Sequence, residues 1–176
     1  MDDSVSMKEH WDDVVSLFSV FAYITKRLDD DGLEMYFTVS ARFEKFKDTT
    51  PAVAHLKSMR QTTFSNINMR LEHILRKYQA DLEHQRERRG TFWSRAKSVK
   101  PLSLYVFTDG AWNGCDAVAP IEAMIEKLRQ LGLPKEQVAI QFIRFGNDEV
   151  GIKRLQYLDS GLREKYGKRW YVQGLP

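Results

Sequence analysis

The sequence predicts an α/β protein built on a doubly wound, mostly parallel sheet with helices on both faces. Two stretches, LSLYVFT at 102–108 and VAIQFIRF at 138–145, are continuous apolar runs rich in β-branched and aromatic residues, as expected of strands buried on both faces. Segments with a 3.6-residue apolar period alternate with them, and this order of strands and helices is typical of a parallel sheet. Such sheets bind ligands beyond the carboxyl ends of their strands.

The first third of the chain contains a long helix and two strands. Apolar residues at helical spacing predict an amphipathic helix over 8–28, with Ser6 and Glu9 as a capping box and Gly32 as the residue that ends it. LEMYFTV at 33–39 predicts a strand, and the partial alternation at 41–47 predicts a short edge strand.

The rest of the chain continues the alternation. A short helix is expected at 52–59, with Pro51 near its first turn. A second long helix presents one apolar face and is expected to fray within 83–89; that face comprises Ile67, Leu71, Ile74, Leu75 and Tyr78. The remaining predictions are helices at 120–131 and 149–158, with Gly132 as the stop signal of the first, and a last strand at 170–172.

Composition narrows the class of protein. The chain has 176 residues, 43% hydrophobic and 29% charged, which suits one globular domain with a sizeable core. Its single cysteine, Cys115, excludes an internal disulfide framework and a Cys-rich zinc site. Because no apolar run is long enough to span a bilayer and no secretory signal opens the chain, we expect a cytoplasmic protein that does not bind membranes.

Three polar clusters are predicted at the carboxyl edge of the sheet. Asp2, Ser4 and Ser6 precede the first helix, the loop 62–66 precedes the second long helix, and Asp109 follows the strand at 102–108. Carboxylate and hydroxyl oxygens without His or Cys favour magnesium, manganese or calcium over zinc. Asn147 and Asp148 also follow a strand, and a turn is the better interpretation of that pair.

These parts, in this order, resemble a metal-ion-dependent adhesion site. The chain is similar to a von Willebrand factor A domain, in the intracellular form common in fungal proteins. The resemblance rests on Asp2-Asp3-Ser4-Val5-Ser6, on TTFSNINMRLEHIL, on VFTDG with Asp109, and on the downstream stretches IEAMIEKLRQLGL and QFIRFGNDEVGIKRLQYLDSGL. It covers nearly all of residues 1–176, which we therefore expect to form a single domain.

The resemblance implies a role for each matching residue. Ser4 and Ser6 would bind the cation through their hydroxyls, and Asp2 and Asp109 would lie near it, directly or through water. The loop hydroxyl of the family is usually Thr, and Ser65 stands at that place, with Thr63 as the alternative. The family's cation keeps an open position for a carboxylate of a partner protein, so the implied function is protein binding through Mg²⁺, Mn²⁺ or Ca²⁺, not catalysis.

The chain also departs from the family. Val5 stands where Gly is usual, at a position that could favour positive φ. The family's central first strand, expected between the strands at 33–39 and 102–108, has no counterpart in the sequence, and the last strand looks shortened. We therefore expect a domain truncated at both ends, with either a gap between those two strands or direct closure of one on the other.

Two other functions fit parts of the sequence. Residues 84–100 hold six basic residues and one acidic residue, so a nucleic-acid-associated module is an alternative, with Phe92 and Trp93 as stacking groups and Arg86, Arg88, Arg89, Arg95 and Lys97 as phosphate contacts. A solvated helix end explains the same residues. A metal-independent adaptor that binds through helix faces or through the basic loop is the other alternative. Phosphoryl-transfer and hydrolase motifs are absent from the sequence, so we expect no enzyme.

Overall fold

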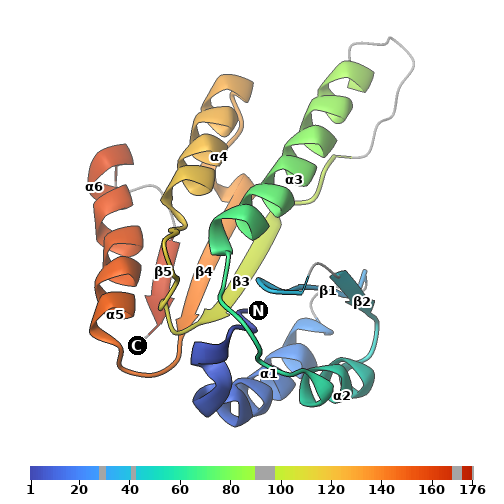
Figure 1. Ribbon diagram of the computed structural model, residues 1–176. Coiled ribbons are helices and arrows are strands. Elements are labelled where there is room, and N and C mark those ends of the chain that lie inside the picture. The colour runs from blue at the N-terminus through green and yellow to red at the C-terminus, as the bar shows by residue number, and fades with distance from the viewer. Residues whose placement is uncertain (28–30, 41–42, 90–97, 168–171, 176) are drawn as a thin grey trace.

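The computed structural model describes residues 1–27, 31–40, 43–89, 98–167 and 172–175, which form a mixed α/β fold (Figure 1). The first half begins with a 3₁₀ helix, Val5–His10, and continues with α1 (Trp11–Thr25), β1 (Leu33–Tyr36), β2 (Phe43–Phe46), α2 (Thr49–Ser58) and α3 (Ile67–Arg89). The second half comprises β3 (Leu102–Thr108), α4 (Val118–Leu131), β4 (Val138–Arg144), α5 (Glu149–Gln156), α6 (Leu162–Tyr166) and β5 (Val172–Leu175).

Two separate sheets organise these elements. β3, β4 and β5 form a parallel sheet in that order, with Leu102 opposite Val138 and Thr108 opposite Arg144. β1 and β2 form an antiparallel hairpin that does not join the parallel sheet. The predicted α/β class with a parallel sheet is therefore confirmed, and within the described residues this sheet has three strands.

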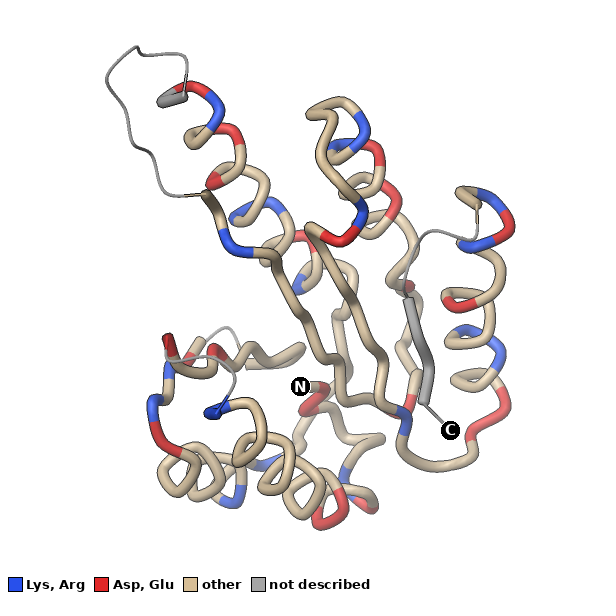
Figure 2. Tube along the Cα trace, turned by 180° about the vertical axis from the view of Figure 1, so that it is seen from behind, with Lys and Arg blue, Asp and Glu red and all other residues tan. Residues whose placement is uncertain are grey.

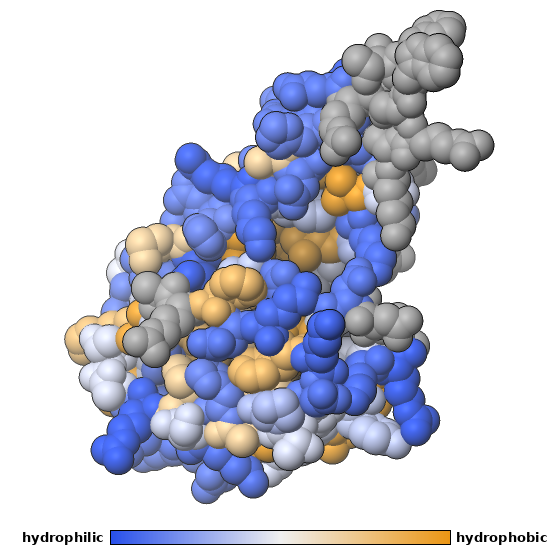
Figure 3. Space-filling model, turned by 90° about the vertical axis from the view of Figure 1, so that its right-hand side faces the viewer, coloured by the Kyte–Doolittle hydropathy of each residue, from blue (hydrophilic) through white to orange (hydrophobic). Residues whose placement is uncertain are grey.

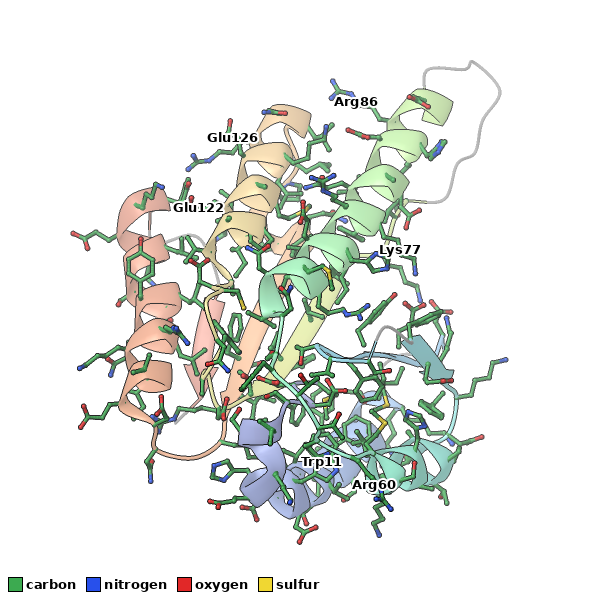
Figure 4. All side chains as sticks on the ribbon, in the orientation of Figure 1. Trp11, Arg60, Lys77, Arg86, Glu122 and Glu126 are labelled. Atoms are coloured by element: carbon green, nitrogen blue, oxygen red, sulfur yellow. The ribbon has the colours of Figure 1, made fainter. Side chains whose placement is uncertain are left out.

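The parallel sheet separates two hydrophobic cores, because successive side chains of a strand point to opposite faces. Val106 of β3 and Phe142 of β4 belong to a core shared with α3, α4 and α5. Phe107 and Ile143, the next residues along the same strands, belong to a second core shared with α1, α2 and β1. Trp11 joins α1 to α2 in that second core, since its indole N–H donates to the carbonyl of Leu56 at 3.0 Å (Figure 4).

Several predicted boundaries need correction. The capping box at Ser6 and Glu9 is wrong: Ser6 lies inside the 3₁₀ helix, and Ser4, which precedes that helix, makes no side-chain cap. The strand at 33–39 ends at Tyr36, and the helix predicted to fray within 83–89 continues to Arg89. The helix at 149–158 continues through a π turn, Tyr157–Gly161, into α6. Two residues of the predicted last strand, 170 and 171, lie outside the described part of the chain.

The first two residues lie between the two sheets. The amino group of Met1 donates to the carbonyl of Tyr36 at 2.8 Å, and the N–H of Thr38 donates to the carbonyl of Met1 at 3.1 Å. These bonds flank Phe37, as in a parallel ladder. On the other side, the N–H of Asp2 donates to the carbonyl of Phe107 at 2.9 Å. Met1 and Asp2 therefore connect the β1 side to the β3 side.

Beyond Met1 the two sheets are separated by a cavity of about 90 Å³. Residues of β1 and β3 line its sides, and α1 and α3 contribute Phe18, Phe21, Ile67, Leu71 and Ile74. β1 and β3 thus lie in separate sheets and do not pair with each other, so of the two expected alternatives direct closure is not observed. None of the described helices is both long and apolar enough to cross a membrane.

One glycine contact holds the end of β3 against α5. A Cβ placed on Gly151 would lie 2.1 Å from the carbonyl oxygen of Asp109, and one placed on Gly110, which has φ +77°, would lie 2.7 Å from the Cα of Gly151. Both clashes involve backbone atoms, so no side-chain rotation relieves them. The close approach of the two glycines therefore fixes where Asp109 stands.

We expect Gly151→Ala to destabilise the protein by about 1–3 kcal/mol, because the new methyl group displaces the backbone at Asp109. A Gly-to-Ala change at an unobstructed helix position stabilises the protein by roughly 0.5–1 kcal/mol. The sign of the stability change therefore shows whether the close contact with Asp109 exists. Urea denaturation measures the effect. Lys153→Ala, an exposed change in the same helix, is the matched control and should be nearly neutral. A stabilised Gly151→Ala protein would contradict the contact.

Candidate functional site

The carboxylate of Asp2 is buried where the two sheets meet, with 1% of the residue exposed. One oxygen, Oδ2, accepts from the hydroxyl of Thr108 at 2.7 Å. The other, Oδ1, accepts from the hydroxyl of Thr38 at 3.1 Å and from the N–H of Ser4 at 3.2 Å. Both oxygens accept hydrogen bonds from neutral donors. The negative charge of Asp2 would therefore attract a nearby cation even if the carboxylate did not coordinate that cation directly.

Asp3, which sequence reasoning did not assign to the site, is equally buried. Its Oδ1 accepts from the N–H of Val39 at 2.7 Å, and its Oδ2 accepts from the N–H of Ser40 at 3.1 Å. These bonds hold the segment after β1 in place. The pattern of alternating acid and hydroxyl residues could not reveal this role, because it depends on a segment 36 residues away in the chain.

The two serines of the N-terminal motif lie together. The hydroxyls of Ser4 and Ser6 are 3.0 Å apart, Ser4 buried and Ser6 exposed. Between them, the N–H of Val5 donates to the carbonyl of Thr63 at 2.8 Å, which joins this motif to the 62–66 loop. Val5 does not adopt positive φ, so its β-branched side chain causes no left-handed strain here.

The two candidates for the loop hydroxyl differ in their surroundings. Thr63 is exposed, and its recorded contact with the N-terminal motif is through its carbonyl. Ser65 is buried, with 5% exposed, and its hydroxyl has no hydrogen-bond partner among the described residues. A buried hydroxyl without a partner is costly, and such a group commonly marks an ion or water site. Ser65 therefore fits the ligand role better than Thr63.

Asp109 completes the cluster at the end of β3. It is buried, and its Oδ1 accepts from the N–H of Ala111 at 2.9 Å, while no described group donates to its Oδ2. Its neighbour Thr108 donates to Asp2 and accepts from the indole of Trp112 at 2.9 Å and from the N–H of Gly110 at 3.0 Å. One threonine hydroxyl thus connects the Asp109 loop to the N-terminal motif.

Other strand-end residues have structural roles. Asp148 is the N-cap of α5 and accepts from the N–H of Gly151 at 2.7 Å, in agreement with its interpretation as part of a turn. Arg154 donates to the carbonyls of Gly110 and Trp112 at 3.0 and 2.6 Å, so it supports the loop that carries Asp109.

The predicted basic surface is described only in part. Arg86 is exposed and points away from the body of the protein near the end of α3 (Figure 4). The side chains of Arg88 and Arg89, and residues 90–97 with Phe92, Trp93, Arg95 and Lys97, lie outside the described part. The nucleic-acid alternative therefore stays a prediction.

The amino group of Met1 is buried beside these carboxylates. Burial lowers its pKa from 8.0 to about 6, and the nearby guanidinium of Arg70 acts in the same direction, while Asp2 and Asp3 oppose the shift. Figure 2 shows acidic positions next to the N-terminus, between the two sheets. Burial therefore disfavours the charged form of this amino group.

The donor set fits a small hard cation. Adjacent ligands of an octahedral Mg²⁺ at about 2.1 Å lie about 3.0 Å apart, which matches the separation of the Ser4 and Ser6 hydroxyls. The partnerless hydroxyl of Ser65 supplies a further oxygen. Among the described residues, no three His, Cys, Asp or Glu side chains are grouped to hold a metal ion. A cation here would therefore depend on serine hydroxyls as well as carboxylates.

Comparison of the chain with protein-family models and with curated proteins gives no match.

We expect Thr108→Val to destabilise the protein by about 2–5 kcal/mol, because it deprives the buried Asp2 carboxylate and the Trp112 indole of a partner without changing side-chain shape. Thr108→Ser keeps the hydroxyl and should cost much less. Chemical denaturation of both variants tests this. Equal losses for the two would show that the methyl group of Thr108, and not its hydroxyl, matters.

Stability should depend on pH through the amino group of Met1. Its pKa is lower in the folded state, about 6, than the ordinary 8.0, so the unfolded chain binds more protons between these values. The free energy of unfolding should therefore rise by about 2 kcal/mol from pH 6 to pH 8 and level off above that. Denaturation at each pH measures the slope. The N-terminally acetylated protein should lack this contribution, and an unchanged slope after acetylation would contradict it.

Proposed function

We propose that this protein binds a partner protein by holding a divalent cation, magnesium, manganese or calcium, at the edge formed by Asp2, Ser4, Ser6, Ser65 and Asp109. In this proposal the mixed α/β fold is a doubly wound domain similar to von Willebrand factor A domains, and a carboxylate of the partner completes the cation's coordination. The cation supplies an electrophilic point that attracts an acidic side chain, and the activity is binding without chemical change.

The single observation that carries the proposal is the buried, partnerless hydroxyl of Ser65. The N–H of Val5 joins the loop of Ser65 to the motif that contains the paired hydroxyls of Ser4 and Ser6. A cation ligated by these hydroxyls would remove the cost of the unpaired one. Asp2, which accepts from Thr108, and Asp109, which accepts from Ala111, would supply negative charge near the cation.

The surface around this edge suits contact with another protein. Ser6 is exposed, and so are two apolar side chains of the joined loops, Val5 at 43% and Phe64 at 65%. Exposed apolar residues around a charged centre are typical of protein-binding sites, where the apolar contact adds area and the charge adds specificity.

A metal-independent adaptor remains a second candidate because of α1. Four of its large apolar residues are at least 42% exposed: Leu17, Val20, Tyr23 and Ile24. Several lie three or four positions apart, on one helix surface, where another protein could bind without a cation.

Magnesium binding is expected to raise the melting temperature. At a concentration about tenfold above the dissociation constant, binding adds about 1.4 kcal/mol, which for a chain of this size corresponds to about 3–6 °C. Differential scanning fluorimetry with MgCl₂, MnCl₂ and CaCl₂, against NaCl at matched ionic strength, measures the shift.

Two variants make this test specific. Asp109→Ala should abolish the shift. Ser65→Ala should reduce it strongly while leaving the metal-free protein as stable or slightly more stable, because the unsatisfied hydroxyl is removed; Ser65→Thr should retain the shift. Asp81→Ala, at an exposed position of α3, is the control. Absence of any divalent-specific shift in the unaltered protein would reject the metal site and leave the adaptor alternative.

A further inference from the structure

The outward face of α1 is apolar at its centre. Leu17, Val20 and Ile24 are 42%, 58% and 52% exposed, and Tyr23 beside them is 55% exposed. Four of the ten large apolar side chains that are exposed in the described part of the chain thus lie on this one helix. The opposite face of α1, with Phe18, packs into the core shared with α2 and β1. An apolar surface concentrated in this way marks an interaction site.

Two charged residues continue the spacing of the apolar ones. The α1 stripe, as we call the whole set, comprises Asp13, Leu17, Val20, Ile24 and Arg27. Its members are separated by four, three, four and three positions along the chain. This alternation keeps one side of a helix against a partner helix whose axis crosses it at about 20°. The α1 stripe therefore suits another helix.

The α1 stripe is accessible to such a helix. Figure 1 shows α1 at the lower edge of the molecule. Its apolar residues stand on the convex surface of a helix, whereas on the side with the β1–β2 hairpin apolar surface lies in a recess among hydrophilic side chains (Figure 3). A second helix can therefore pack along the length of α1.

The two ends of the α1 stripe carry opposite charges. Asp13 lies in the first turn of α1. Arg27 lies just after the last turn, where its N–H donates to the carbonyl of Ile24 at 3.1 Å and its guanidinium donates to the hydroxyl of Tyr23 at 2.8 Å. Both charged side chains are exposed, and neither forms an ion pair with a described residue. Each can therefore pair with an opposite charge on a partner.

This order of residues is complementary to itself. When two copies of α1 lie antiparallel about a twofold axis at Val20, residues equally far before and after Val20 face each other. Leu17, three positions before, then faces Tyr23, three positions after, and Asp13, seven before, faces Arg27, seven after. A twofold interface requires this kind of self-complementary surface. A parallel arrangement would instead bring like charges together at both ends, which is unfavourable.

Other occupants fit the α1 stripe less well. A helix that binds an anionic membrane surface has a basic polar face, whereas this stripe carries one acidic and one basic residue. An unrelated protein could cover the apolar residues, but its binding would not explain why the charges at the two ends match each other. The second copy explains both the apolar centre and the charged ends.

We propose that two copies of this chain associate through α1, packed antiparallel about a twofold axis at Val20, with Asp13 of each copy paired to Arg27 of the other. The interface contains none of the proposed cation ligands and does not depend on the cation site. α1 has 15 residues, so its face is about 22 Å long and about 10 Å wide. Each partner of a stable complex buries about 800 Å², so this smaller contact forms a weak dimer that dissociates at micromolar concentrations.

Analytical ultracentrifugation of the full chain without added metal tests the proposal. Between about 5 and 300 μM the average mass should rise from that of one chain towards that of two. Val20→Glu places two carboxylates at the twofold axis and should weaken association at least about tenfold. Val150→Glu changes an equally exposed apolar residue of α5, at 54%, and is the matched control that should leave association unchanged.

An exchange of charges tests the antiparallel arrangement. Asp13→Arg and Arg27→Asp each place like charges at both ends of the interface, so each variant alone should associate at least about tenfold more weakly. An equal mixture of the two variants should associate again, because every end pair then joins opposite charges. Added salt should weaken association in the mixture, since the pairs are exposed. Circular dichroism melting shows that each variant is folded.

Three outcomes would overturn the proposal. A chain that stays monomeric up to about 300 μM would leave the face of α1 to a different protein. Association that Val20→Glu and Val150→Glu weaken equally, or that neither changes, would place the interface elsewhere. A mixture of the two charge variants that associates no better than either variant alone would reject the antiparallel pairing of Asp13 with Arg27.

Discussion

The carboxylate of Asp2 holds the two halves of this protein together. One of its oxygens accepts from Thr108 at the end of β3, and the other accepts from Thr38 beyond β1. No hydrogen bond between β1 and β3 replaces this connection among the described residues. Because the carboxylate is buried, each bond to it is strong and each missing donor would be costly.

The same arrangement explains why polar groups that could bind a ligand lie together at this edge of the sheet. The hydroxyl of Thr108 connects Asp2 to the loop that contains Trp112. The hydrogen bond from Val5 to Thr63 holds the loop of Ser65 next to the N-terminal motif. Regular secondary structure satisfies its own backbone groups, whereas these short segments rely on side chains to do so. At the hydroxyl of Ser65 and at the Nε of Arg70 that satisfaction is incomplete, and the hydroxyl of Ser65 supports the proposed cation site.

The two proposed sites differ in what they would recognise. The cation edge presents hydroxyls and carboxylates next to exposed apolar residues, and it suits an acidic side chain on a folded surface. The face of α1 presents exposed apolar side chains between opposite charges, and it suits a second copy of the same chain.

Much of this arrangement could be predicted from local sequence. The apolar runs predicted β3 and β4, and the helical period predicted α1, α3 and α4. The order of these elements predicted that Asp2, Ser4, Asp109 and the loop 62–66 lie at one edge, and the choice of Ser65 within that loop rested on the resemblance. These features depend on neighbours a few residues away, which the sequence displays directly. What only the tertiary structure decided involves partners far apart in the chain: the pairing of β1 with β2 instead of β3, the contacts of Asp3 with Val39 and Ser40, and the place of Met1 between two sheets. Local patterns carry no information about such partners, because burial and hydrogen bonding at these positions are set by packing across the whole fold.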